Sequence, residues 1–107
     1  DLIEGVIPPP SEALKREALR KAGQLYASRG WTGLDNMSVM ADDLALLRDE
    51  AAKGDFHIRV DNYMDPSGAA EVLAKGPQTD ATGLIRTRGI KLYMDGALGS
   101  RGAAGAL

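Results

Sequence analysis

The chain has 107 residues, of which 44% are hydrophobic and 26% are charged, the proportions of an ordinary globular segment. Its 13 basic and 15 acidic side chains leave a net charge of −2, which provides no basic surface for nucleic acid or for an anionic membrane. The absence of cysteine excludes disulfides, thiolate metal sites and a cysteine nucleophile, and it fits a reducing, cytoplasmic location.

The first half of the chain alternates between helical and extended patterns. Ser11 follows three prolines and can cap a helix whose apolar residues recur at helical spacing until Gly30. Residues 31–37 are predicted to form a strand. Ser38 is then predicted to cap a second helix, which ends before Gly54. The apolar face of this second helix is predicted to contain Met40, Leu44, Leu47 and Ala51.

The second half continues the same alternation. A second strand is predicted over residues 56–64. Asp65 as the cap and Pro66 in the first helical position then begin a short helix, which stops at Gly76. Residues 78–83 are predicted to be a loop. A third strand is predicted to start about 30 residues after the second and to run through the alternating residues 90–95. Strand starts about 25 to 30 residues apart are typical of parallel strands joined by crossover helices, so the predicted fold class is α/β.

The predicted strand 56–64 has one apolar and one polar face. Ile58 and Val60 fall on the apolar face, whereas Asp61 and Tyr63 fall on the other. A parallel strand buried on both faces is usually apolar throughout. Two interpretations stay open: the polar face lines an interior that holds a site near Tyr63, or it is exposed in an open sheet, with Arg59 paired to Asp61 or its neighbours. His57, on the polar face at the start of the strand, is not expected to be a metal ligand.

The third predicted strand contains a lysine beside a glycine-rich turn. Ile90, Leu92 and Met94 alternate with Lys91, Tyr93 and Asp95, and the whole segment from Gly89 reads G-I-K-L-Y-M-D-G-A-L-G-S-R-G. This segment resembles the strand-four signature of metal-dependent amidohydrolases, in the group that includes the N-substituted formamide deformylases. A weaker likeness covers residues 8–37, where Asn36 replaces the aspartate that is usual in the family.

The resemblance implies a (β/α)₈ barrel, a fold of about 250 residues. Residues 1–107 are therefore expected to form one partial domain of about three β/α units, with both ends of the chain cut. The implied activity is hydrolysis of C–N bonds in small-molecule amides or formamides with a divalent metal, zinc being the expected ion.

The resemblance also implies roles for particular side chains. Lys91 is expected to be a metal ligand in the complete barrel, as a carbamate formed with carbon dioxide. Tyr63, Asp95 and Arg101 are expected near the substrate-binding mouth. The family's histidine ligands would lie outside this chain, so no complete catalytic set and no bound metal are expected in the isolated chain. The alternative for Lys91 is an ordinary strand lysine that extends to water or pairs with Asp95.

A second class of function is a non-catalytic α/β remnant or a self-associating module. In either case strands cut from a barrel leave unpaired edges, so a homo-oligomer is expected. The neighbouring coding sequence separates the two classes. A His-x-His motif upstream and two further histidines downstream would identify the enzyme, and stop codons there would favour the remnant.

Overall fold

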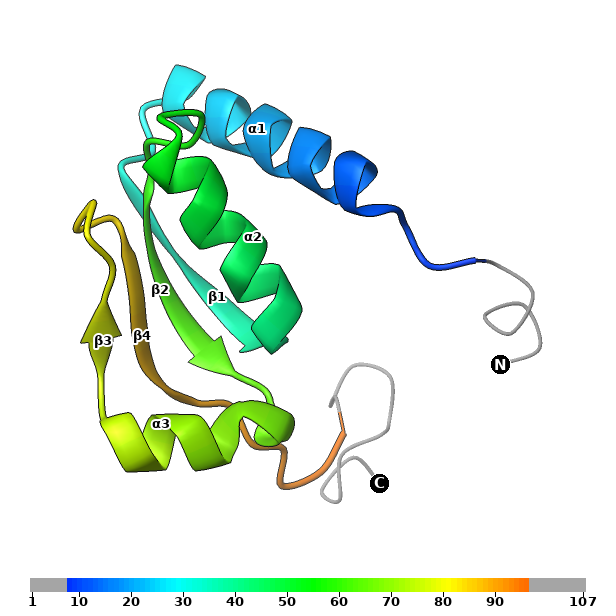
Figure 1. Cartoon of the computed structure of the whole chain (residues 1–107), viewed down its shortest axis with the longest axis vertical. Coiled ribbons are helices and arrows are strands. Elements are labelled where there is room, and N and C mark those ends of the chain that lie inside the picture. The colour runs from blue at the N-terminus through cyan, green and yellow to red at the C-terminus, as the bar shows by residue number, and fades with distance from the viewer. Residues whose placement is uncertain (1–7, 97–107) are drawn as a thin grey trace.

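The computed structural model describes residues 8–96, which form a four-stranded sheet with helices on one side (Figure 1). The elements are α1 (Glu12–Ser28), β1 (Gly33–Val39), α2 (Ala41–Ala52), β2 (Arg59–Met64), the 3₁₀ helix η1 (Pro66–Gly68), α3 (Ala69–Lys75), β3 (Gln78–Thr79) and β4 (Ile85–Ile90). The strand order is β1-β2-β4-β3, with β1, β2 and β4 parallel and β3 antiparallel to β4. The α/β prediction is confirmed at this level.

The first helix begins and ends at the predicted signals. The Ser11 hydroxyl accepts a hydrogen bond from the backbone N–H of Leu14 at 3.2 Å, as an N-cap should. After the helix, Gly30 has a φ of +82°, which glycine adopts without steric cost. No helix among residues 8–96 is both long and apolar enough to cross a membrane.

The predicted cap of the second helix is wrong. Strand β1 continues through Ser38 to Val39, and Met40 occupies the N-cap position of α2 without a side-chain cap hydrogen bond. Asp42 and Asp43 in the first turn provide the negative charge that a helix N-terminus favours. Met40 is 58% exposed, so it does not join the apolar face predicted for this helix.

The predicted loop over residues 78–83 contains a short edge strand. Gln78 and Thr79 pair with the side of β4 that faces away from β2. The Asp80 carboxylate holds the following turn, since it accepts hydrogen bonds from the Thr82 hydroxyl at 2.7 Å and from the Ile85 N–H at 3.1 Å. A two-residue strand carries too little pattern to be recognised before its partner is known.

The third predicted strand ends earlier than expected. β4 ends at Ile90, and the Lys91 N–H makes a further hydrogen bond of 2.8 Å to the Met64 carbonyl oxygen. β2 ends at Met64, so the chain beyond Lys91 has no strand to pair with on that side. Leu92 and Met94, predicted for an apolar face, are 67% and 99% exposed.

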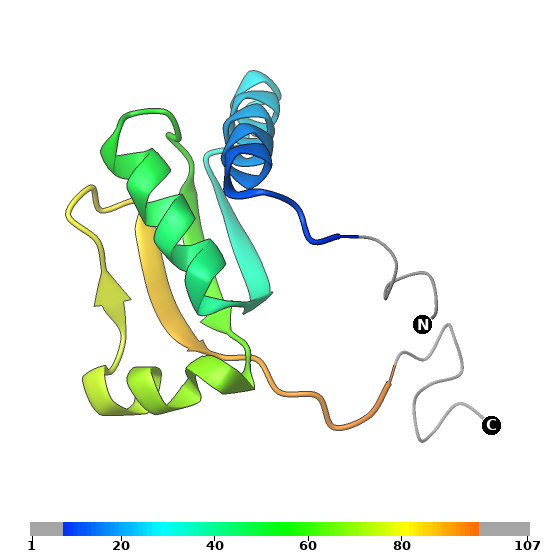
Figure 2. The same cartoon turned by 45° about the vertical axis from the view of Figure 1, so that its right-hand side comes forward.

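The apolar core lies between α2 and one face of the sheet (Figure 2). Leu44 and Leu47 of α2 pack in the same cluster as Val60 of β2 and Ile85 of β4. The fully buried Asn62 on this face is satisfied, because its Nδ2 donates to the carbonyl oxygen of Arg86 at 3.0 Å and its Oδ1 accepts from Asn36 at 3.3 Å. The structure therefore confirms which side chains of β2 were predicted to face the core and which were predicted to face the other way.

A buried carboxylate joins α1 to α2. Glu50 of α2 is 0% exposed. It accepts hydrogen bonds from Arg16 at 3.0 Å and from Arg20 at 3.3 Å, both on α1. The hydrogen bond from Arg16 lowers the pKa of Glu50, outweighing the burial that would raise it. This ion pair compensates for removing the charge of Glu50 from water.

Candidate functional site

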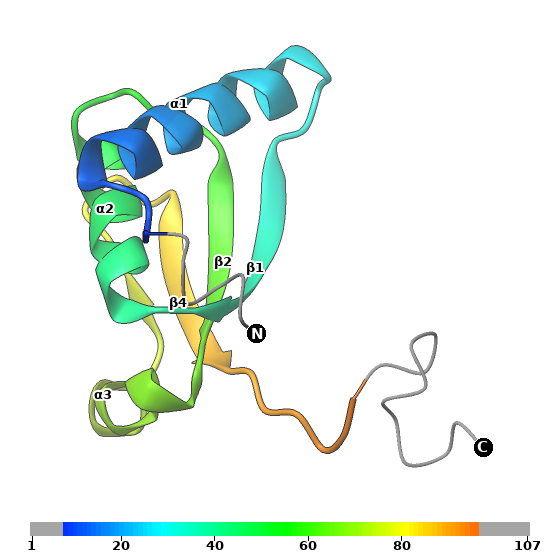
Figure 3. The same cartoon turned by 90° about the vertical axis from the view of Figure 1, so that its right-hand side faces the viewer.

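The carboxyl ends of β1, β2 and β4 meet at one edge of the sheet, at the bottom of Figure 1. α/β proteins with parallel strands carry their sites at this edge. α2 lies on one face of the sheet, and within residues 8–96 no helix lies against the opposite face (Figure 3). We call this opposite surface the open face, defined by Asp35, Met37, Asp61, Tyr63 and Arg86.

Two irregularities in strand pairing flank Tyr63. Met37 and Val39 of β1 pair with Tyr63 and Met64 in turn, which leaves Ser38 as an extra residue. On the other side, the partners of Asn62 and Tyr63 are Thr87 and Gly89, which leaves Arg88 as an extra residue in β4. Such bulges redirect the side chains that follow them.

The bulge in β4 decides which face Lys91 occupies. In an unbroken strand, Arg86 and Lys91 would point to opposite faces because they are an odd number of positions apart. The extra residue Arg88 reverses the alternation, so Ile90 pairs with the buried Met64 on the helix-covered face. Lys91 follows on the open face, the same face as Arg86.

Lys91 is half-buried, and the aromatic ring of Tyr93 lies next to it. The Nζ atom of Lys91 is 5.3 Å from the centroid of this ring, within the range of a cation–π interaction. The Tyr93 hydroxyl oxygen is in turn 2.9 Å from the hydroxyl oxygen of Ser38. These contacts join the end of β1 to the segment that follows β4. Sequence reasoning placed Tyr93 on a strand that in the structure ends at Ile90 and gave it no role, and it misassigned Ser38 as a helix cap.

The other predicted residues of the mouth differ in their placement. Tyr63 is half-buried at the carboxyl end of β2, and its partner Gly89 leaves space for its ring, because a Cβ atom there would lie 3.3 Å from Tyr63 Cδ1. Asp95 lies in the exposed segment after Tyr93. Arg101 is outside the described residues. The structure thus brings Tyr63 and Lys91 to the same edge of the sheet.

Further along the open face, an ion pair crosses from β2 to β4. Arg86 donates two hydrogen bonds to Asp61, and the one from Nη2 to Oδ2 is 2.7 Å long. This pairing lowers the pKa of Asp61 and raises that of Arg86. The sequence indicated Arg59 as the first partner for Asp61, but the register places Arg86 directly opposite. The sequence contained one signal for Arg86: Arg86 and Arg88 alternate with Ile85 and Thr87, as expected for a strand.

The described residues do not form a metal site by themselves. Across residues 8–96 no group of three or more His, Cys, Asp and Glu side chains is placed to hold an ion. His57 is exposed and precedes β2, away from the carboxyl edge.

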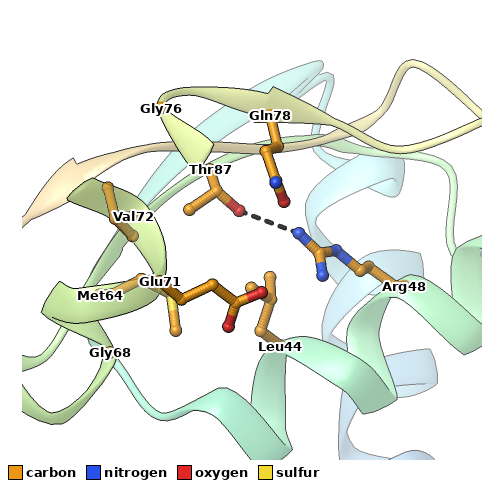
Figure 4. Close-up of a pocket in the computed structure, with 9 residues that line it drawn as sticks. All are labelled: Leu44, Arg48, Met64, Gly68, Glu71, Val72, Gly76, Gln78 and Thr87. Carbon is orange, nitrogen blue, oxygen red and sulfur yellow. Dashed lines mark hydrogen bonds between the residues drawn. The ribbon is translucent and has the colours of Figure 1, made fainter. Parts of the chain in front are cut away.

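A small pocket lies on the covered side of the sheet, between α2, α3 and β4 (Figure 4). Its volume is about 20 Å³, which is enough for about one water molecule. Arg48 lines it and donates a hydrogen bond of 3.2 Å to the Thr87 hydroxyl. The pocket is too small for an organic substrate.

Comparison with known proteins finds a structural similarity to one solved structure. No family model matches the chain, and no curated protein matches its sequence. The chain is similar to an uncharacterized metal-dependent hydrolase from Pyrococcus horikoshii OT3, with a TM-score of 0.72 and 23% sequence identity. The similarity covers 86% of this chain and 19% of that chain. The chain thus spans about a fifth of the hydrolase, and the likeness establishes a shared fold.

Proposed function

We propose that this chain is a segment of a metal-dependent hydrolase of the amidohydrolase type, with residues 1–107 supplying about three β/α units of a (β/α)₈ barrel. The observation that carries this proposal is the position of Lys91. It follows β4 at the carboxyl edge of the parallel strands, on the open face, in a sequence that resembles the family's strand-four signature. A fold shared with a segment of a metal-dependent hydrolase supports it.

The arrangement of the sheet also supports a barrel. β1, β2 and β4 are parallel neighbours in chain order, with α2 on one face. In a barrel this face would lie outside and the open face would line the interior, where Asp61 and Arg86 satisfy each other's charge. The β3 hairpin would then be a local addition to the β/α pattern.

In the complete enzyme, Lys91 would contribute its amine to the metal site. The nitrogen would add to the carbon of carbon dioxide, forming an N–C bond and releasing a proton to water. The product is a carbamate with two oxygen atoms that suit a divalent cation such as zinc. Tyr63, Asp95 and Arg101 are the proposed residues of the mouth for a small amide or formamide.

We expect the 107-residue chain to show no hydrolase activity above background. A catalytic zinc site uses about three protein ligands, and Lys91 supplies one. The measurement is hydrolysis of N-substituted formamides by the purified chain with zinc, manganese or cobalt added. Metal-dependent turnover that persists after repurification would contradict the proposal that the site is incomplete in this chain.

The coding sequence around the chain tests the proposal directly. We expect a His-x-His motif upstream and two further histidines downstream, and the protein made from the extended reading frame should bind a divalent metal and hydrolyse a C–N bond. Stop codons on both sides, or an extended protein without either property, would instead favour a non-catalytic module.

We also propose that the chain forms homo-oligomers. β1 is at the end of the strand order, so one of its edges lacks a strand partner among residues 8–96. Met37 on the open face is 48% exposed, and Met94 is 99% exposed. An unpaired edge beside exposed apolar side chains favours pairing with another copy. Light scattering after size exclusion should give a mass above 11.3 kDa, and a sharp monomer at high concentration would contradict this.

A further inference from the structure

Ser38 adopts a backbone conformation that is unfavourable for serine. Its φ is +59°, in the left-handed region where most residues other than glycine meet steric hindrance. It is also the extra residue of the bulge in β1. Unfavourable backbone conformations persist when surrounding contacts hold them, and both they and bulges are frequent at functional sites.

The contact made by the Ser38 side chain lies at the carboxyl edge of the sheet. In a regular strand, Ser38 would point to the helix-covered face, because Met37, the residue before it, belongs to the open face. The bulge instead places its hydroxyl oxygen 2.9 Å from that of Tyr93. Tyr93 is 69% exposed and lies beyond the end of β4. The hydrogen bond to Ser38 therefore restrains a ring that has few other contacts to fix it.

We propose that Ser38 is a positioning residue that acts through Tyr93 to fix the side chain of Lys91. The centroid of the restrained Tyr93 ring lies 5.3 Å from Lys91 Nζ. Because the ring face attracts the ammonium group, the position of the ring determines the position of the lysine side chain. Two bulges cooperate in this arrangement: the one at Arg88 selects the face of Lys91, and the one at Ser38 orients its aromatic neighbour. Any catalytic role of this positioning rests on the proposed function, whereas the positioning of Lys91 by Ser38 and Tyr93 does not.

Two substitutions remove the hydrogen bond without removing the ring or the bulge. Ser38→Gly keeps the positive φ, which glycine adopts freely, and removes the hydroxyl. Tyr93→Phe keeps the ring and removes its hydroxyl. Tyr26→Phe is the matched control, because Tyr26 is a partly exposed tyrosine on α1 whose ring contacts Trp31.

The measurement is proton–carbon NMR of the full chain labelled with ¹³C-lysine, with Lys91 assigned through Lys91→Arg. Protons held over a ring face resonate upfield, so the ε-methylene protons of Lys91 should be displaced from those of the other lysines. We expect Ser38→Gly and Tyr93→Phe each to move this resonance toward the other lysines, and the double variant to show no further change. Tyr26→Phe should leave it in place.

A conservative variant separates positioning from general structure. Asparagine tolerates the left-handed conformation, and its amide can bond to the Tyr93 hydroxyl, so Ser38→Asn should restore part of the displacement. An undisplaced Lys91 resonance in the unmodified chain, or a displacement that survives both Ser38→Gly and Tyr93→Phe, would overturn the proposal. Because this readout needs neither metal nor hydrolysis, an inactive extended protein would contradict the proposed function and leave this result unaffected.

Discussion

Replacing Lys91 by alanine in the complete enzyme is expected to abolish hydrolysis. Under the proposed function, this change removes a metal ligand at the carboxyl end of β4. Changes to groups that only support metal ligands reduce metal affinity or activity about 10- to 100-fold. Loss of a ligand itself should therefore lower kcat/KM by more than about a hundredfold. Metal content, measured by atomic absorption on the same preparation, should fall with the rate.

The matched control is Lys75→Ala. Lys75 is an exposed residue of α3 that pairs with Glu71, and no role in the site is proposed for it. This variant should retain both rate and metal. Short carboxylic acids added to Lys91→Ala should restore part of the activity, because they supply the two oxygen atoms of the missing carbamate. If Lys91→Ala kept its metal and its rate, Lys91 would be a structural residue only.

Replacing Glu50 by glutamine is expected to lower the free energy of unfolding by about 2 kcal/mol, the value of a hydrogen bond to a charged group. Glu50 is fully buried and accepts hydrogen bonds from Arg16 and Arg20. Glutamine keeps the shape but turns one acceptor oxygen into a donor that faces these donors. Urea unfolding followed by circular dichroism measures the change.

The exposed pair on α1 provides the control for this substitution. Glu17 bonds to Lys21 one helical turn away, and both side chains are more than half exposed. Glu17→Gln should leave the urea midpoint nearly unchanged, because solvent screens such pairs. An equal loss of stability in the two variants would contradict the prediction that burial makes Glu50 contribute more to the free energy of unfolding than an exposed glutamate.

The pH dependence of stability follows from the same carboxylate. Arg16 holds the pKa of folded Glu50 below its ordinary value of 4.5. A carboxyl group with a lowered pKa in the folded state stabilises the protein above its unfolded pKa and loses this contribution as pH falls through the folded pKa. Unfolding at a series of pH values below 4.5 should therefore show a steeper loss for the unmodified chain than for Glu50→Gln. Parallel curves would contradict this assignment.

Features that depend on a few neighbouring residues were predictable from the sequence. The Ser11 cap, the end of the first helix near Gly30 and the two-faced pattern of β2 appear in the structure as expected. Capping and alternation act over one turn of helix or two residues of strand, so the sequence contains their full cause. The α/β class follows from the same local periods.

The arrangement of the candidate site was decided only by tertiary structure. Alternation relates Lys91 to Ile90, but the face on which Lys91 lies depends on the bulge at Arg88, which exists only against β2. The Ser38 hydroxyl meets that of Tyr93 across 55 residues of sequence. Ser38 by itself is compatible with a helix cap or with a bulge, because its hydroxyl can hydrogen-bond to nearby groups in both. The partner strand made that choice, since pairing in the sheet fixed register and bulges together.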